Sequence, residues 1–511
     1  MAQKFTRDEV LQNNNEESLW CVIDSWVYDL TEFLDAHPGG RAVLLQVGGK
    51  EATDDFYNLH RQAVLDRYSH LRIGAIADEK PRVLRQQPGD LSPVPYAEPA
   101  WLTPQFRSPY YNESHRRLQK AMRHFTDTYV RPEAQEKEAS GQKISQELIQ
   151  RMASANILAM RVGPGDHLNN RSILNGVLDG KDFDPFHDLI VNQELVRAAA
   201  RGFWDGNMVG MTISLTAVMH HSNDASFRDN IVESCLSGQK TICLAVSEPF
   251  AGSDVANLRT VAEKTADGKH YIVNGTKKWI TNGTWCDYFV TAVRTSTGLS
   301  VLLIERSEGV ETKPIKTAYS AAAGTALVTF DDVKVPVGNL LGEEGRGIYV
   351  VLSNFNHERW MVSSASIRMS RLVVEECLKW SHQRAIFGKR LIDQPVIREK
   401  LARMMALVEA TQAWLEHITY QLSQKSYQDQ STDLAGPIGL LKMYSSRCAR
   451  EIAELAVQIF GGRALTQGGM GNIIEMAHRT SGFDAILGGS EDIIGDMAVR
   501  QASKAFPKSM L

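Results

Sequence analysis

The spacing of hydrophobic and polar positions changes three times along the chain. Residues 110–235 have apolar residues at the three- and four-residue intervals of amphipathic helices, as in SHRRLQKAMRHFTDTYV. Between residues 241 and 335, short β-branched and aromatic runs such as DYFVTAV and SVLLIER alternate with Gly, Asn and Asp turns. Helical spacing returns from Gly347 onward. The pattern predicts a helical domain, a β domain and a second helical domain.

A proline-rich stretch precedes these three domains. Seven of the 17 prolines lie between Pro81 and Pro109. Because proline has no amide donor and biases the preceding residue toward extended geometry, this stretch cannot be a regular helix or a central strand. It predicts a semi-rigid linker that could span several tens of ångströms at roughly 3 Å per residue. The expected divisions are a small domain at 1–78, the linker at 79–109, and larger domains at 110–240, 241–345 and 346–511.

Length and composition narrow the class of protein. A chain of 511 residues is too long to fold around one hydrophobic core, so several domains are expected. Lys and Arg number 56 against 60 Asp and Glu, which gives no excess of positive charge for nucleic acid. The six cysteines are scattered without a CxxC pair, as is typical of a reducing compartment. No apolar run reaches the length of a membrane span, so we expect no nucleic-acid partner and no membrane span.

Two histidines mark candidate metal chemistry in the small domain. In FLDAHPGG, the sequence Pro38-Gly39-Gly40 predicts a sharp turn that leaves His37 on a loop, and His60 follows 23 residues later. Two imidazoles on separate elements can bind both faces of a haem iron, which suits electron transfer rather than oxygen chemistry. The alternative for the tetrapeptide alone is a simple turn.

The surrounding sequence favours the haem interpretation. The segment from WCVIDSWVYDLTEFLDAHPGG to YSHLRIGAI resembles the cytochrome b5 family over residues 3–77. This resemblance implies haem b held between two helical hairpins, with His37 and His60 as its axial ligands. The stretch from Phe56 to His60 is one residue shorter than in the microsomal members, so His70 is the other candidate for the second ligand.

The large domains contain a second series of motifs. CLAVSEPFAGSDV and NGTKKWITNG are followed by HERW, RAIFGKRLID, AVQIFGGRALTQGGMGN and ILGGSEDI. In this order and spacing they resemble the flavin-dependent acyl-CoA dehydrogenase family from about residue 110 to 505. The resemblance implies an α+β fold: a small cytochrome b5-like domain, then a body with an N-terminal helical domain, a middle β domain and a C-terminal four-helix bundle. It also implies FAD, an acyl-CoA substrate and a homo-oligomer, either a dimer or a tetramer.

The same resemblance assigns the cofactor and substrate contacts. Ser253 would meet the CoA portion of the substrate. Arg384 and Phe387, with Gln458 and Gly462, would reach the FAD of a neighbouring subunit. Gln394 stands one residue earlier than the family's glutamine and receives no role. The full set of residues expected to bind FAD is Leu244, Ser247, Trp279, Thr281, Arg384, Phe387, Gln458, Gly462, Ser490 and Asp492.

The catalytic base is displaced from its usual position. Oxidation of a CoA thioester needs a carboxylate near the α carbon and donors for the carbonyl oxygen. Many members carry the base in a motif ending Tyr-Glu-Gly-Thr, where this chain has Leu487-Gly488-Gly489-Ser490. Isovaleryl- and long-chain-type members carry it at the position of Glu358. We therefore predict Glu358 as the base, Gly488 as a backbone N–H donor to the thioester oxygen, and Arg359 at the substrate pocket. The alternative for Glu358 is a solvated ion pair with Arg359.

The combination of domains predicts the reaction. We expect FAD-dependent oxidation of an acyl-CoA to the 2,3-enoyl-CoA, with electrons passing one at a time to the tethered haem and then to an unknown acceptor. One alternative is a flavin oxidase or monooxygenase of the same fold acting on a non-CoA substrate. Another is a non-catalytic electron carrier that binds acyl-CoA. The sequence Ser509-Met510-Leu511 resembles a peroxisomal C-terminal tripeptide, so a peroxisomal or cytoplasmic location is expected rather than a mitochondrial one.

Overall fold

The computed structural model describes residues 3–83, 86–353 and 355–507. The tripeptide at residues 509–511 lies outside them. Contacts divide the chain into two compact units. The first contains the residues up to Gln87 together with Leu378–Arg398 and Phe460–Asn472, and the second contains the rest. Among the described residues, no helix is both long enough and apolar enough to cross a membrane.

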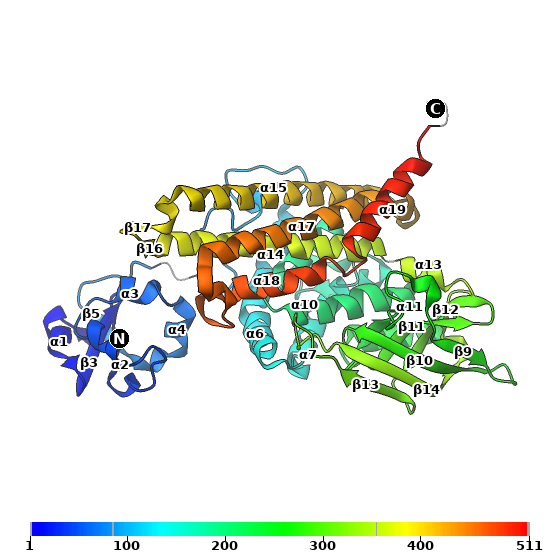
Figure 1. The fold of residues 1–511 in the computed structure, drawn as a ribbon, viewed down its shortest axis with the longest axis horizontal. Coiled ribbons are helices and arrows are strands. Elements are labelled where there is room, and N and C mark those ends of the chain that lie inside the picture. The colour runs from blue at the N-terminus through cyan, green and yellow to red at the C-terminus, as the bar shows by residue number, and fades with distance from the viewer. Residues whose placement is uncertain (1–2, 84–85, 354, 508–511) are drawn as a thin grey trace. The chain divides into compact units, whose positions relative to one another are not determined.

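The small N-terminal domain is built on a five-stranded sheet (Figure 1). Along β3, Leu19, Cys21 and Ile23 are buried on one side of the sheet and Val22 on the other, as expected for period-two alternation. The strands, in the order β1-β5-β4-β3-β2, are β1 (Gln3–Phe5), β2 (Asn14–Asn15), β3 (Ser18–Ile23), β4 (Trp26–Asp29) and β5 (Arg72–Ile76). The helices are α1 (Arg7–Gln12), α2 (Arg41–Val47), α3 (Thr53–Tyr57) and α4 (Gln62–Arg67).

Both ends of the proline-rich stretch are anchored. The N–H groups of Arg82 and Val83 donate to Asp24 in the small domain, at 2.5 and 3.0 Å. On the other side, the Gly89 N–H donates to Asp127, and Trp101 is buried and stacks on Tyr111 with ring centres 4.0 Å apart. Most of the described residues of the stretch therefore pack against the domain next to them, where the sequence predicted a spacer.

The first helical domain surrounds α9, a helix buried on nearly every side. Asn112 and Asp184 cap α5 and α9, which satisfies amide groups that helix starts leave without intrahelical partners. The helices are α5 (Glu113–Phe125), α6 (Arg131–Ser140), α7 (Gln146–Ser154), α8 (Ile157–Met160), α9 (Pro185–Val196), α10 (Arg201–Asn207), α11 (Thr216–His221) and α12 (Ala225–Leu236), with π-helical turns at Thr126–Val130 and Met208–Leu215. Strands β6 (Ser172–Ile173) and β7 (Leu178–Asp179) form a short hairpin.

The middle domain is an eight-stranded sheet, drawn in green in Figure 1. Most neighbours are antiparallel, but β8 pairs parallel with β11. The ladder between β10 and β14 shifts register between Lys277 and Ile280, which marks a β-bulge. The strands are β8 (Ile242–Ala245), β9 (Val261–Lys264), β10 (His270–Ile280), β11 (Tyr288–Thr295), β12 (Gly298–Glu305), β13 (Val310–Pro314), β14 (Ala326–Pro336) and β15 (Leu340–Leu341).

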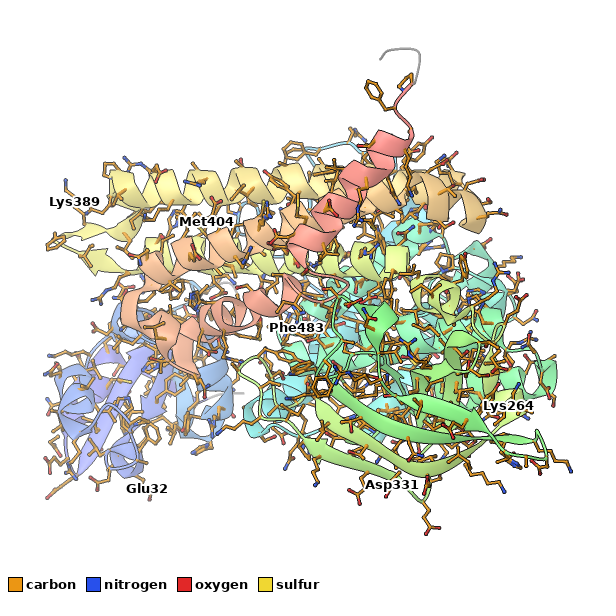
Figure 2. All side chains as sticks on the ribbon, turned by 45° about the vertical axis from the view of Figure 1, so that its right-hand side comes forward. Glu32, Lys264, Asp331, Lys389, Met404 and Phe483 are labelled. Carbon is orange, nitrogen blue, oxygen red and sulfur yellow. The ribbon has the colours of Figure 1, made fainter. Side chains whose placement is uncertain are left out.

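The C-terminal domain is a bundle of long helices. In Figures 1 and 2, α14, α15 and α17 run side by side. The indole N–H of Trp360 on α14 donates to Thr419 on α15 at 2.9 Å inside the bundle. The helices are α13 (Gly347–Leu352), α14 (Phe355–Gln383), α15 (Pro395–Gln424), α16 (Tyr427–Asp433), α17 (Ala435–Phe460), α18 (Asn472–Asp484) and α19 (Glu491–Lys504), with a hairpin of β16 (Ala385–Ile386) and β17 (Lys389–Arg390) after α14. The α+β fold class predicted from the sequence is confirmed by this order of domains.

Candidate functional site

Glu358 lies in the first turn of α14 and is buried, with 4% of its surface exposed. A β carbon added at Gly488 would lie 3.6 Å from its Oε1 atom, so the two positions considered for the base face the same point. Among the described residues, Glu358 Oε2 has no hydrogen-bond partner. A buried oxygen without a partner is costly and marks a place where a ligand could bind. The solvated ion-pair alternative for Glu358 does not fit this burial.

The turn between α18 and α19 is held beside this carboxylate. Gly488 and Gly489 both have positive φ angles, 71° and 105°, which glycine adopts without strain. Arg359 Nε donates to the Gly488 carbonyl at 2.9 Å, and Lys442 Nζ donates to the Gly489 carbonyl at 2.8 Å. Within the described part of the chain, the N–H of Gly488 forms no hydrogen bond. This amide is therefore available for a substrate oxygen, and its role as a donor to the thioester stays a prediction.

Burial sets the protonation of Glu358. It raises the pKa of Glu358 to about 7, and the nearby charges of Arg359 and Lys442 only partly oppose this. Burial lowers the pKa of Lys442 to about 8, although Asp484, Glu491 and Glu358 favour its charged form. The Glu358 carboxyl therefore titrates close to neutral pH, which suits a group that must accept a proton. Lys442 was not predicted from the sequence, because one lysine in a helical pattern gives no sign of its distant neighbours.

Four predicted flavin contacts lie on two adjoining segments of the β domain. Leu244 is on β8, and the carbonyl of Ser247 accepts a hydrogen bond of 2.9 Å from the Lys278 N–H, next to Trp279. Trp279 stands at the β-bulge with φ of 63° and has 51% of its surface exposed. Thr281 is buried two residues further on. An exposed indole held in a strained backbone conformation is an open platform, so this segment fits a planar ring system such as isoalloxazine.

The other predicted contacts lie on loops and helix ends. Ser253 is exposed on a loop of the β domain. Ser490 is the residue before α19, and Asp492 in its first turn forms an ion pair with Arg447 at 3.3 Å. The roles of Ser253, Ser490 and Asp492 toward CoA and FAD stay predictions.

The residues expected to reach a neighbouring subunit are exposed. Phe387 has 94% of its surface exposed and a φ of 50° at the turn between β16 and β17, and Arg384 is half-buried at the start of that hairpin. Gln458 is exposed on α17, and a β carbon added at Gly462 would meet no atom within 4 Å. The arrangement leaves these residues open to a second chain.

The two candidate haem ligands face each other in the small domain. The ring centres of His37 and His60 are 6.3 Å apart. Two imidazoles that bind one metal ion from opposite sides have centres roughly 6 Å apart, because each metal–nitrogen bond is about 2 Å and each nitrogen lies about 1 Å from its ring centre. His37 Nδ1 lies 3.3 Å from the Gly40 carbonyl, which fixes Nδ1 as the donor and leaves Nε2 for a metal. His70 is exposed, so the geometry favours His60 over it.

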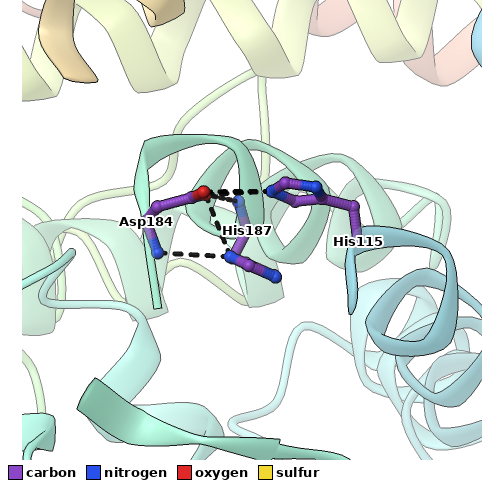
Figure 3. A group of neighbouring side chains, drawn as sticks. All are labelled: His115, Asp184 and His187. Carbon is purple, nitrogen blue, oxygen red and sulfur yellow. Dashed lines mark hydrogen bonds and ion pairs between the residues drawn. The ribbon is translucent and has the colours of Figure 1, made fainter. Parts of the chain in front are cut away.

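His115, Asp184 and His187 form a third group of side chains of the types that ligate metals, but their hydrogen bonds do not fit a metal site (Figure 3). His115 Nδ1 accepts from the Asn112 N–H, and His187 Nδ1 accepts from the Asp184 N–H. The Nε2 atoms of His115 and His187 lie 3.1 Å from Asp184 and 3.0 Å from the Ser114 hydroxyl, and His187 Nδ1 is also 2.9 Å from an Asp184 carboxylate oxygen. Burial lowers the pKa of His187, which keeps this ring neutral at pH 7. All four ring nitrogens are engaged within the group, which caps α5 and α9.

A separate pocket of about 80 Å³ lies between α6, α10 and β8. Its lining includes Ala134, Lys137, Phe203 and Ile242. None of the predicted base, flavin or haem residues lines it. The pocket is therefore distinct from the groups around Glu358 and Trp279.

Sequence comparisons identify the families to which parts of the chain are similar. Family profiles match at residues 345–502 (acyl-CoA dehydrogenase, C-terminal domain), 243–333 (acyl-CoA dehydrogenase, middle domain) and 6–77 (cytochrome b5-like heme/steroid binding domain). The chain is 36% identical to acyl-CoA dehydrogenase apdG of Emericella nidulans, over 82% of this chain and 97% of the relative. It is 34% identical to acyl-CoA dehydrogenase AFT10-1 of Alternaria alternata, over 81% and 96%.

A solved structure gives the same result for the body of the protein. An acyl-CoA dehydrogenase from Geobacillus kaustophilus matches with a TM-score of 0.67 at 25% identity, over 78% of this chain and 100% of that one. The chain belongs to the acyl-CoA dehydrogenase family and has a cytochrome b5-like domain at residues 6–77.

Proposed function

We propose that this enzyme oxidises an acyl-CoA thioester to the 2,3-enoyl-CoA and that the electrons pass from FAD to the haem of its own cytochrome b5-like domain. When bound, FAD supplies the acceptor for the β hydride and haem b supplies an acceptor for single electrons. The single observation that carries the proposal is the buried Glu358 carboxylate beside Gly488, with one oxygen that has no partner among the described residues.

The residues around Glu358 have complementary tasks. Glu358 removes the proton from the α carbon, and its near-neutral pKa leaves a substantial fraction ionised at pH 7. The N–H of Gly488 donates to the thioester oxygen, where negative charge develops as the proton leaves. Arg359 and Lys442 are bonded to the carbonyls of this turn, so they hold the Gly488 amide in position. Trp279 and Thr281 would hold the flavin ring against the β carbon.

The small domain would hold haem b between His37 and His60. Their spacing fits ligation from both faces, which leaves no open position for oxygen. The rings of Phe33 and Phe56 lie beside them, with centres 5.9 Å from His37 and 5.0 Å from His60. An apolar surround of this kind suits a buried macrocycle. The exposed Phe387 and the open Gly462 support assembly into a homo-oligomer that completes the flavin site.

A Glu358→Gln variant tests the proposal. The amide has the shape of the acid but cannot accept the proton, so flavin bleaching by acyl-CoA should slow at least a hundredfold while bound FAD is retained. Anaerobic stopped-flow absorbance gives the rate, and the flavin spectrum gives the occupancy. Glu399→Gln, at an exposed glutamate of α15, is the matched control and should keep the normal rate. Normal bleaching by the Glu358→Gln enzyme would refute the assignment of the base.

A further inference from the structure

A second buried carboxyl group lies in a charged network close to the proposed base. Asp205 on α10 is fully buried and accepts a 2.8 Å hydrogen bond from Arg201 Nε through Oδ2. The other end of Arg201 donates to Asp484 at 2.5 Å, and Asp484 also accepts from the Ser366 hydroxyl at 2.9 Å. The Arg201 guanidinium lies between the rings of Trp204 and Phe483, at 5.2 and 5.3 Å.

The network shares its supporting elements with Glu358 and Gly488. Glu358, Val362 and Ser366 follow one another at four-residue intervals, so they line one face of α14. The polypeptide segment that places Gly488 opposite Glu358 also places Asp484 opposite Ser366. Eight helical residues separate the two ends, which is roughly 12 Å. An acyl chain with its α carbon at Glu358 that ran along this face would reach Arg201, Asp205 and Asp484 at its far end.

One atom of this network lacks a partner. Asp205 Oδ1 is buried and has no hydrogen bond with any described residue. Burial raises the pKa of Asp205 to about 7, with Arg201 opposing the shift and Asp484 adding to it. Both protonation states are therefore accessible near neutral pH. A hydroxyl group can donate to the carboxylate or accept from the acid, so it satisfies Oδ1 in either state.

We propose that Asp205 is a specificity-determining residue that binds a hydroxyl group on the distal part of the substrate's acyl chain. This rests on the proposed function, because it takes the substrate to be an acyl-CoA. An extended chain advances roughly 1.3 Å per bond, the projection of a C–C bond of about 1.5 Å. The hydroxyl then lies about eight to ten carbons from the thioester.

Without such a contact, the enzyme should prefer the plain alkyl chain over the hydroxylated one. A hydroxyl loses its hydrogen bonds to water when it enters an apolar pocket, so an ordinary acyl site prefers the plain alkyl chain. A hydrogen bond to a buried carboxyl group restores that loss and leaves an alkyl chain facing an unsatisfied oxygen. A preference for the hydroxylated chain is therefore diagnostic.

The test compares 8-hydroxyoctanoyl-CoA and 10-hydroxydecanoyl-CoA with octanoyl-CoA and decanoyl-CoA on the holoenzyme. Flavin bleaching gives kcat/KM, and at least one hydroxylated chain should be preferred about tenfold over its alkyl partner. Calorimetric binding of the matching CoA thioethers, which lack the thioester carbonyl, should show the same preference in Kd. If no thioester bleaches the flavin, the proposed function is wrong. The Kd values of the thioethers still test whether Asp205 binds the hydroxyl.

Two variants complete the test. Asp205→Leu should lose the preference for the hydroxyl and gain activity on the alkyl chains. Ser366→Ala removes a hydroxyl that bonds Asp484 and leaves Asp205 in place, so it should keep the preference. Wild-type enzyme that favours the alkyl chain at both lengths would overturn the proposal, and this comparison stands even if Asp205→Leu does not fold. An unchanged preference in a folded Asp205→Leu enzyme would overturn it equally.

Discussion

Two buried carboxyl groups, Glu358 and Asp205, each keep one oxygen without a hydrogen bond among the described residues. Nearly all buried polar atoms in proteins have partners, so such exceptions call for a physical reason. Burial raises the pKa of both groups to about 7. Both features fit groups that meet a ligand: Glu358 at the reacting carbon, and Asp205 further along the chain.

The protonation of Glu358 predicts a pH dependence. The base acts only when ionised, so the rate of flavin reduction should rise with pH through about 7 and level off above pH 8. Stopped-flow bleaching by an alkyl acyl-CoA between pH 5.5 and 9 measures it. A rate that is constant over this range would mean that Glu358 is ionised throughout or is not the base.

Gly488 predicts an effect of backbone conformation. Its φ of 71° lies in the left-handed region, so Gly488→Ala should lower the free energy of unfolding by about 1–2 kcal/mol. The new β carbon would be only in ordinary contact with Arg359, 3.5 Å from its Cγ, so strain rather than collision causes the loss. Urea unfolding measures the change.

Gly482→Ala is the control for this substitution. Gly482 lies inside α18, and a β carbon there meets no atom within 4 Å. Alanine should therefore stabilise the protein by about 0.5–1 kcal/mol through helix propensity. Equal effects of the two substitutions would contradict the role of the positive φ angle.

Sequence alone was enough to propose Glu358 as the base, since its motif and the missing glutamate at Gly488 pointed to the same function. It could not identify Lys442 or Asp205. Lys442 donates to Gly489, 47 residues away. Asp205 is linked through Arg201 to Asp484, 279 residues further along the chain. Such pairs are made by folding and leave no local pattern in the sequence.

At the scale of elements, the proline-rich stretch is the clearest difference from expectation. Its composition correctly excluded a long helix, but it predicted a spacer where the structure has an anchored segment. Glu98 is buried and accepts two hydrogen bonds from Arg123, at 2.5 and 2.8 Å. Arg371 donates to the backbone carbonyls of Tyr96 and Glu98. Arg371 lies on α14, more than 270 residues away, so the sequence pattern could not reveal the contact.

Glu98→Gln tests this anchor. Loss of the carboxylate leaves Arg123 and Arg368 with less compensation for their buried charge, so the free energy of unfolding should fall by about 3 kcal/mol. Thermal or urea unfolding of the whole chain measures it. Glu136→Gln breaks an exposed pair with Lys137 and should change stability by less than about 0.5 kcal/mol. Similar effects of both variants would show that the anchor contributes little.

The bundle and the middle sheet were predictable because long helices and alternating strands repeat their pattern over many residues. The β-bulge at Trp279 was not, since it depends on the register of β10 against β14, a strand some fifty residues further along the chain. The bulge exposes the indole that the family resemblance assigns to the flavin.

At the scale of the whole molecule, loss of haem from the small domain should leave flavin reduction by acyl-CoA intact. His37→Ala and His60→Ala should each lose haem, because each removes one axial ligand, and both should still bleach their flavin with acyl-CoA. The haem absorbance band measures occupancy. His70→Ala changes an exposed residue and should keep haem. Loss of haem in the His70 variant with retention in the His60 variant would reverse the assignment.

The central claim joins the two domains in one reaction, and one measurement tests it most directly. The purified holoenzyme is titrated with acyl-CoA without oxygen while the flavin and haem bands are recorded together. The predicted result is flavin bleaching followed by haem reduction, at a rate independent of protein concentration because both groups belong to one chain. Flavin that bleaches while the haem stays oxidised, or haem reduction that depends on protein concentration, would contradict the internal route.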